Sequence, residues 1–196
     1  MIAQKQLLLG LMLLTTALLI TVSPSVSPAQ DLSMCSTEAQ ALLKQNQQIQ
    51  ALGVVRQALE EVWKHIAFQA ARNVLVKEKA SGYGQFEPRT NNVYKAGEVI
   101  RLYLEPVGFA QKKVKDHYAV GLEDDFAVTD SAGKIIGGQE NFWRYETTSR
   151  NFLDDFFVNL DFTFTGLNPG AYEIKTVFRD LGSTKTLTVN TPVRIE

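Results

Sequence analysis

Alternation of apolar and polar residues in short runs, from about residue 70 to the C-terminus, constrains the fold of this chain most. The clearest run extends from Phe156 to Thr165, and its period of two places successive side chains on opposite faces of a strand. Runs of similar character lie at 72–77, 99–105, 117–130, 135–145, 172–180 and 187–195. They recur at roughly 8–14-residue intervals with turns and no helical pattern between them, which predicts seven or eight strands in an antiparallel β-sandwich.

Residues 1–29 have the pattern of a secretory signal peptide. Lys5 precedes an apolar stretch from Leu7 to Val22, and a segment of prolines and small residues follows. Ser27 and Ala29 fit cleavage before Gln30. An uncleaved membrane anchor is the alternative, since an apolar run of roughly 16 residues is near the lower limit for spanning a bilayer. We predict an exported protein, periplasmic or extracellular, with no integral membrane span after cleavage.

Cys35 is the only cysteine, so no intrachain disulfide can form and a hydrophobic core must hold the exported domain together. The stretch Leu32-Ser33-Met34-Cys35 resembles a bacterial lipoprotein signal only weakly, because polar and small residues separate it from the apolar stretch. We therefore expect a free thiol on a mobile tail, with an intermolecular disulfide as the alternative, and not a lipid-modified cysteine.

Residues 30–69 are expected to form a linker and an amphipathic helix. Thr37 followed by Gln40 has the spacing of a capping box at a helix start. Apolar residues recur at intervals of three and four over residues 52–66, whereas residues 44–48 are polar on nearly all sides. One helix of about 30 residues would be roughly 45 Å long. It either packs on the sandwich with a frayed start, or forms a short coiled coil or partner-binding helix.

A Pro-Gly turn followed by a tyrosine marks the entry to the penultimate strand. The pattern Leu167-x-Pro169-Gly170-x-Tyr172 precedes an alternating strand that ends at Asp180, a turn and a last alternating strand. This arrangement resembles the closing hairpin of immunoglobulin-like and fibronectin type III-like domains, and Tyr172 is similar to their tyrosine corner. The resemblance implies an immunoglobulin-like β-sandwich over residues 70–196, in a protein similar to exported bacterial envelope proteins. It identifies no specific family, and the cysteine pair of true immunoglobulin domains is absent.

Residues that commonly carry catalysis or bind metals are sparse. His65 has no second ligand at helical spacing, and His117 begins a strand beside Asp116. The chain contains no Gly-x-Ser-x-Gly nucleophile pattern. Acidic clusters at 123–125 and 154–155 do not converge, since neighbours on a strand point to opposite faces, and we expect them at solvated strand ends. We predict no enzyme activity, no metal site and no cofactor.

Aromatic and polar side chains on the strands are the candidate binding residues. Trp143 and Tyr145 share one face of a strand and are suited to stack on a sugar or to anchor a protein. A tryptophan buried in the sandwich core is the alternative for Trp143. Tyr103 and Glu105 lie in an outward row of another strand, and we place Arg89 near it as part of a polar binding face.

The formal net charge of −1 does not favour nucleic acid or an anionic membrane as a partner. We therefore predict a non-catalytic exported domain that acts by protein binding or envelope assembly. Its partner is another protein, or a second copy that binds through the N-terminal helix. The alternative is a carbohydrate-binding module that holds a glycan with its surface aromatics.

Overall fold

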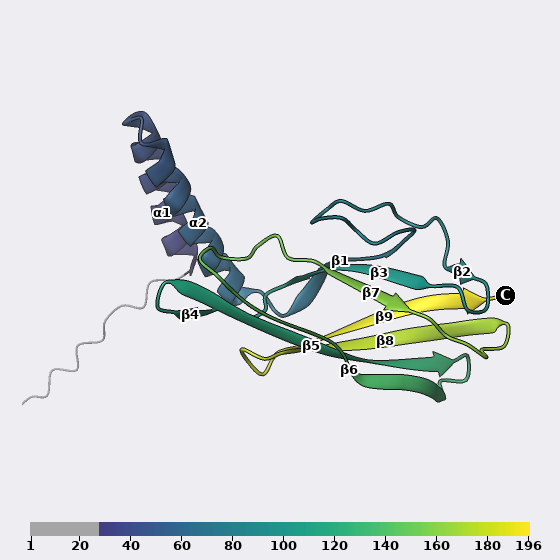
Figure 1. Ribbon diagram of the computed structural model, residues 1–196. Coiled ribbons are helices and arrows are strands. Elements are labelled where there is room, and N and C mark those ends of the chain that lie inside the picture. Colours follow the sequence, from purple (N-terminus) through teal and green to yellow (C-terminus); the bar gives the residue numbers. More distant parts are fainter. Residues whose placement is uncertain (1–27) are drawn as a thin grey trace, which may run out of the picture.

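The computed structural model describes residues 28–196, where two helices precede nine strands (Figure 1). The helices are α1 (Pro28–Lys44) and α2 (Gln48–His65). The strands are β1 (Gln69–Val76), β2 (Val93–Tyr94), β3 (Ile100–Val107), β4 (Lys112–Val114), β5 (His117–Asp130), β6 (Ile135–Ser149), β7 (Val158–Phe162), β8 (Gly170–Asp180) and β9 (Thr186–Ile195). The chain is mainly β, as the alternation predicts. The predicted signal peptide lies outside the described residues, apart from its last two positions.

The prediction of one long helix is wrong, because α1 and α2 form a helical hairpin that stands at one end of the sheets (Figure 1). Asn46 ends α1 in the left-handed conformation, with a φ of 58°. The Gln47 N–H donates to Leu42 O at 2.9 Å and the Asn46 N–H to Leu43 O at 3.1 Å, the two bonds of a Schellman motif. Neither helix in the described part of the chain is long and apolar enough to cross a membrane.

The two helices pack through small side chains. Ala39 of α1 and Ala51 and Val54 of α2 are buried, with Cys35 and Leu42 packed against them. The Cys35 thiol is therefore half-buried in the hairpin and not on a mobile tail. The capping box predicted at Thr37 is also wrong: the residue lies inside α1, and its hydroxyl donates to Ser33 O at 3.0 Å.

The strands form two sheets. One has the order β1-β3-β7, and the other has the order β2-β9-β8-β5-β4, with β6 paired to the other edge of β5 from Tyr118 to Thr129. Their pairings are antiparallel except that β2 runs parallel to β9, which corrects the expectation of a wholly antiparallel fold. The short strands β2 and β4 raise the number of strands in residues 28–196 above the seven or eight predicted.

The inner faces of both sheets meet over one hydrophobic core. The three-stranded sheet contributes Ile100, Leu102, Leu104, Val158, Leu160 and Phe162. The larger sheet contributes Val120, Leu122, Val128, Ile174, Phe178, Leu187, Val189, Val193 and Ile195. Nearly every one of these positions alternates with a more exposed neighbour along its strand, as a sheet with one buried face requires. The arrangement is consistent with a β-sandwich.

Two consecutive glycines, Gly137 and Gly138, lie in β6. The register of β5 and β6 shifts on either side of this pair, between Asp124 and Phe126 and between Val128 and Thr129. A Cβ at Gly138 would lie 2.5 Å from Phe126 O, so no larger residue fits without a shift of the backbone. The backbones of β5 and β6 therefore approach each other closely at Gly138.

The corner before β8 has the predicted geometry. The Tyr172 hydroxyl donates to Asn168 O at 2.8 Å. Ile174, Thr176 and Phe178, which follow Tyr172 on the same face of β8, are fully buried. The hydrogen bond thus closes the turn at the point where β8 enters the core.

Replacing Tyr172 with Phe should lower the free energy of unfolding by about 1 kcal/mol, the usual net contribution of one hydrogen bond. The ring remains, so only the hydroxyl contact to Asn168 is lost. Urea unfolding followed by far-ultraviolet circular dichroism measures the change. An unfolding free energy equal to that of the wild type would remove the structural role of this corner.

Candidate functional site

Trp143 and Tyr145, the predicted aromatic binding pair, lie in β6 with their rings nearly parallel. The ring centroids are 6.0 Å apart and the planes differ by 6°. Trp143 also packs edge-on against Phe178, and Tyr145 contacts Phe156 at 5.1 Å. Trp143 is half-buried and Tyr145 is 36% exposed. Packing within the protein therefore covers much of both rings, and the area left for a sugar is small.

Tyr103 and Glu105 are buried, so they do not form the exposed polar face expected from the alternation in β3. The Tyr103 ring stacks on Phe86 at 4.3 Å and on Phe157 at 5.7 Å, which cover this face of the strand. Its hydroxyl donates to Glu105 Oε1 at 2.7 Å and accepts the Gly84 N–H at 2.7 Å. Burial raises the pKa of Tyr103 to about 12. This pair fastens the segment before β2 to the sheet.

Arg89 makes a separate structural contact. Its guanidinium lies 4.1 Å from the centre of the Tyr94 ring, donates to Glu98 Oε1 at 2.8 Å and donates to Val93 O at 2.7 Å. These partners hold the turn that precedes β3. The structure does not unite the five predicted residues in one site: Trp143 and Tyr145 are on β6, Tyr103 and Glu105 are beneath a loop, and Arg89 is beside β2.

The acidic residues of β5 lie in the middle of a continuous strand and not at a solvated strand end. Glu123 and Asp125 face outward, where Arg179 of β8 donates to Glu123 Oε1 at 3.0 Å and to Asp125 Oδ1 at 2.9 Å. These hydrogen bonds hold the pKa of both carboxyls below their usual range. The described residues contain no cluster of three His, Cys, Asp or Glu side chains arranged to hold a metal ion.

Asp124, between them, points into the core and has no exposed surface. It is paired across the ladder with Trp143 and Phe178, and neither carboxyl oxygen has a hydrogen-bond partner of normal geometry among the described residues. Burial raises the pKa of Asp124 to about 7, while the backbone N–H of Trp143 acts in the opposite direction. The expectation of a solvated carboxylate is therefore wrong at Asp124, which lies inside a long strand with its side chain in the core.

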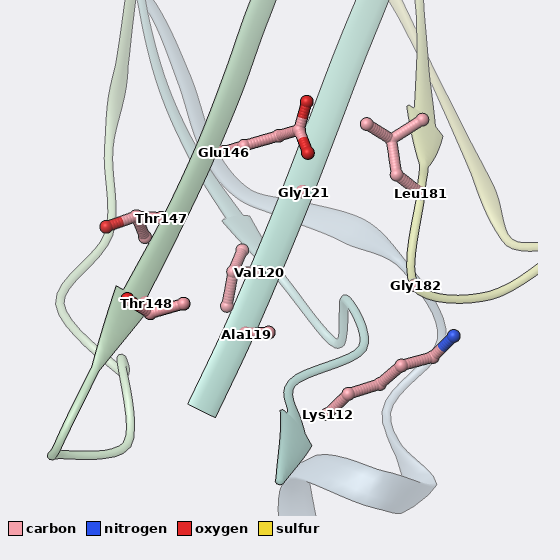
Figure 2. Close-up of a pocket in the computed structure, with 9 residues that line it drawn as sticks. All are labelled: Lys112, Ala119, Val120, Gly121, Glu146, Thr147, Thr148, Leu181 and Gly182. Carbon is pink, nitrogen blue, oxygen red and sulfur yellow. The ribbon is translucent and has the colours of Figure 1, made fainter. Parts of the chain in front are cut away.

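A shallow hollow of about 460 Å³ lies over Gly121 on the outer face of β5 (Figure 2). Figure 2 shows Glu146 reaching across β5 toward Leu181, and Lys112 extending toward Gly182. A Cβ at Gly121 would approach Leu181 Cβ to 3.1 Å, so the glycine preserves this space. The lining is mixed and open to solvent, without a set of converging polar groups, and sequence reasoning did not point to it.

Trp63 anchors the C-terminal end of α2 in the core. Its indole N–H donates to Phe109 O at 2.8 Å, and its ring meets Phe109 and Phe152 edge to face at 5.2 and 5.3 Å. The Tyr118 hydroxyl donates to Glu60 Oε1 at 2.8 Å from the adjacent strand. The base of the hairpin is thus attached to the sheets by both apolar and polar contacts.

Above this anchor, one side of α2 presents an apolar stripe, defined by Leu52, Val55, Leu59 and Val62. Leu52, Val55 and Val62 are 45%, 54% and 38% exposed, and Leu59 is half-buried. These residues are spaced by three, four and three positions, which places them on one face of a helix. The sequence pattern at 52–66 predicts this face, but only the structure shows that neither α1 nor the sheets fully cover it.

The opposite side of the hairpin is acidic. Asp31 and Glu38 of α1 and Glu60 and Glu61 of α2 line a shallow depression that also includes Met34. Met34 is 65% exposed, and it is an isolated apolar side chain among carboxylates. The hairpin therefore has two chemically distinct sides, and the apolar stripe is the larger continuous apolar surface of the two.

Asp124→Asn tests the buried carboxyl. The folded-state pKa of about 7 exceeds the unfolded value of 3.8, so the folded protein holds an extra proton between these values and loses stability as pH rises through the interval. The difference in unfolding free energy between the variant and the wild type should therefore increase by about 3 kcal/mol in favour of the variant from about pH 5 to about pH 8, since one pKa unit corresponds to about 1.4 kcal/mol. Urea unfolding at both pH values measures the gain. Surface Asp155→Asn is the control, and a pH-independent difference for Asp124→Asn would contradict the assignment.

Comparison with known proteins assigns no family to the chain. No family model matches it, and no curated protein matches it. A superoxide reductase (neelaredoxin) from Ignicoccus hospitalis is 8% identical over 65% of this chain and 82% of its own, with a TM-score of 0.33. The alkylpurine DNA glycosylase AlkC from Pseudomonas fluorescens, bound to DNA with an abasic site analogue, is 10% identical over 86% of this chain and 46% of its own, with a TM-score of 0.37. The sporulation control protein Spo0M from Bacillus subtilis is 11% identical over 67% and 50%, with a TM-score of 0.31. These similarities assign neither a family nor an activity.

Proposed function

We propose that this protein is an exported, non-catalytic, immunoglobulin-like domain that acts by protein binding, and that its helical hairpin is the binding element. The observation that carries the proposal is the apolar stripe on α2. Leu52, Val55 and Val62 each expose more than a third of their surface, whereas Ala51, Val54 and Trp63 of the same helix are buried against α1 or in the main core. Contiguous exposed apolar residues are characteristic of interaction sites.

The occupant that fits the apolar stripe best is the same stripe on a second copy of this chain. Spacings of three, four and three read the same from either end, so two antiparallel copies place Leu52 opposite Val62 and Val55 opposite Leu59. Alternating intervals of three and four residues are those of a coiled-coil seam. A two-fold contact of this kind is self-complementary, as most homodimer interfaces are. Only four side chains of each copy take part, so the dimer is expected to be weak.

An immunoglobulin-like architecture is supported by two mainly antiparallel sheets that share one core and by the Tyr172 corner at the start of β8. Export is supported by the charge and hydropathy pattern of residues 1–29. A binding role without catalysis agrees with the placement of the polar groups. Glu123, Asp125 and Glu105 each accept a hydrogen bond or ion pair from a side chain of this chain.

Self-association is tested with the double variant Leu52→Ser, Val55→Ser. Sedimentation velocity of the secreted wild type from about 10 to about 500 μM should show a rising dimer fraction, whereas the double variant should remain monomeric, since it loses half of the contact. Met34→Ser is the matched control, because it removes an exposed apolar side chain on the acidic side and should dimerise as the wild type does.

The result that overturns self-association is a wild type that stays monomeric at every concentration. Equal loss of dimer in Met34→Ser and in the double variant would also contradict it, since the contact would then not lie on the apolar stripe. Circular dichroism must show unchanged helicity in both variants, because the substituted side chains are exposed and their loss should leave the hairpin folded.

Export is tested by the mass of the secreted chain. Expression of the full sequence in a bacterium with two membranes should yield a periplasmic protein whose N-terminus is Gln30, because Ser27 and Ala29 meet the small-residue requirement of signal peptidase. Intact-mass spectrometry of the periplasmic fraction measures this. Full-length chain recovered only in the membrane fraction would instead support the uncleaved anchor.

A further inference from the structure

A groove of about 370 Å³ lies at the junction between the end of α2 and the sheets, on a part of α2 that does not include the apolar stripe. Four aromatic side chains form its wall: Trp63, Phe109, Tyr118 and Phe152. We call this space the junction groove. Its volume falls within the range of sites that hold small organic molecules.

The aromatic wall is preorganised. Trp63 and Phe109 are buried and form the floor, whereas Tyr118 and Phe152 are half-buried and keep part of their rings accessible. The Tyr118 and Phe152 rings meet at 5.7 Å and 86°, and Trp63 meets Phe152 at 90°. Edge-to-face packing of this kind fixes each ring, so a flat apolar ligand finds a surface that does not need to rearrange.

The rim of the junction groove is basic. Lys64, Lys113 and Lys185 line it, against a single lining carboxylate, Glu60. The Glu60 carboxylate already accepts the Tyr118 hydroxyl. Lys64 is paired with Glu61, whereas Lys113 and Lys185 have no carboxylate within ion-pair distance in residues 28–196. The Lys113 ammonium lies 5.5 Å from the centre of the Tyr118 ring, at the edge of the aromatic wall. The excess of positive charge favours an anion at the mouth of the groove.

The neutral polar groups of the wall already form hydrogen bonds within the protein. Both ends of the Gln111 amide bond to the backbone of Leu153, at 2.7 and 2.8 Å, and the Trp63 indole bonds to Phe109 O. Lys185 donates to Gly108 O at 2.8 Å and to Ile66 O at 3.3 Å, which leaves one of its three N–H groups. The groups left to meet a ligand are therefore ammonium N–H donors and aromatic faces.

We propose that the junction groove binds a small amphipathic anion, with a flat apolar body against Tyr118 and Phe152 and an acidic group held by Lys113 and Lys185. The aromatic wall supplies apolar contact and the lysines select negative charge. The proposal does not depend on self-association, because none of the four residues of the apolar stripe lines the junction groove.

Naphthalene-2-sulfonate is the test probe, and naphthalene-2-sulfonamide is its uncharged match in shape. Binding is followed through the indole N–H resonance of Trp63 in two-dimensional NMR spectra of the secreted protein. The chain has two tryptophans, so the Trp63 resonance is the one that remains in the Trp143→Phe variant. The sulfonate should shift this resonance and saturate by about 10 mM, and the sulfonamide should bind about fivefold more weakly.

Lys113→Gln should weaken sulfonate binding about fivefold, because it removes one rim ammonium at an exposed position. Lys112→Gln is the matched control: this neighbouring lysine of β4 lines the hollow of Figure 2 instead, and its loss should change nothing. The proposal is overturned if the Trp63 resonance does not move, if the sulfonate and the sulfonamide bind equally, or if Lys112→Gln weakens binding as much as Lys113→Gln does. The Leu52→Ser, Val55→Ser variant should bind the sulfonate normally even if self-association fails.

Discussion

The placement of the helical hairpin depends on one buried side chain, Trp63. Its indole fills the end of the core and donates to Phe109 O, so apolar burial and a hydrogen bond act on the same residue. The chain at Phe109 must also pass close to the helix end. Gly108 has a φ of 77°, and a Cβ there would lie 2.4 Å from Ala67 O. Only glycine allows this approach, and Lys185 then bonds the carbonyls on both sides of the contact.

The anchored helix leaves part of its apolar surface exposed, because α2 cannot bury all of its apolar residues against one partner. Its small residues Ala51 and Val54 pack on α1, and Trp63 enters the core. Leu52 and Val55 lie on a third side, which neither neighbour reaches. A helix with three apolar sides is suited to the middle of a bundle. Within one copy of the described chain, α2 has partners for only two of those sides.

Local sequence pattern located the long strands, because most of them bury one face and a period of two is the direct result. The run 156–165 forms a shorter strand than expected, Val158–Phe162. It missed β2 and β4, since two or three residues are too few to show a period. It also missed the break between the helices, because Asn46 adopts the left-handed conformation without a glycine or proline to signal it. The alternation in β3 correctly placed Tyr103 and Glu105 on the face of the strand opposite the main core. It could not show that Phe86 and Phe157, distant in sequence, cover them.

The polar residues show why the candidate sites lie around α2 and not on the strands. Arg179, Arg89 and Glu105 are the chemically prominent side chains of the sheet domain, and each is held by partners from its own chain. A charged group whose hydrogen bonds are satisfied internally gains little from a ligand, since binding would first break those contacts. Lys113 has no carboxylate partner in the described residues and lies only against the Tyr118 ring, and the apolar stripe lacks a covering helix. A ligand or partner can pair with a charge that has no counter-ion, and it can cover exposed apolar side chains. Both features occur beside α2, the helix that Trp63 holds in place.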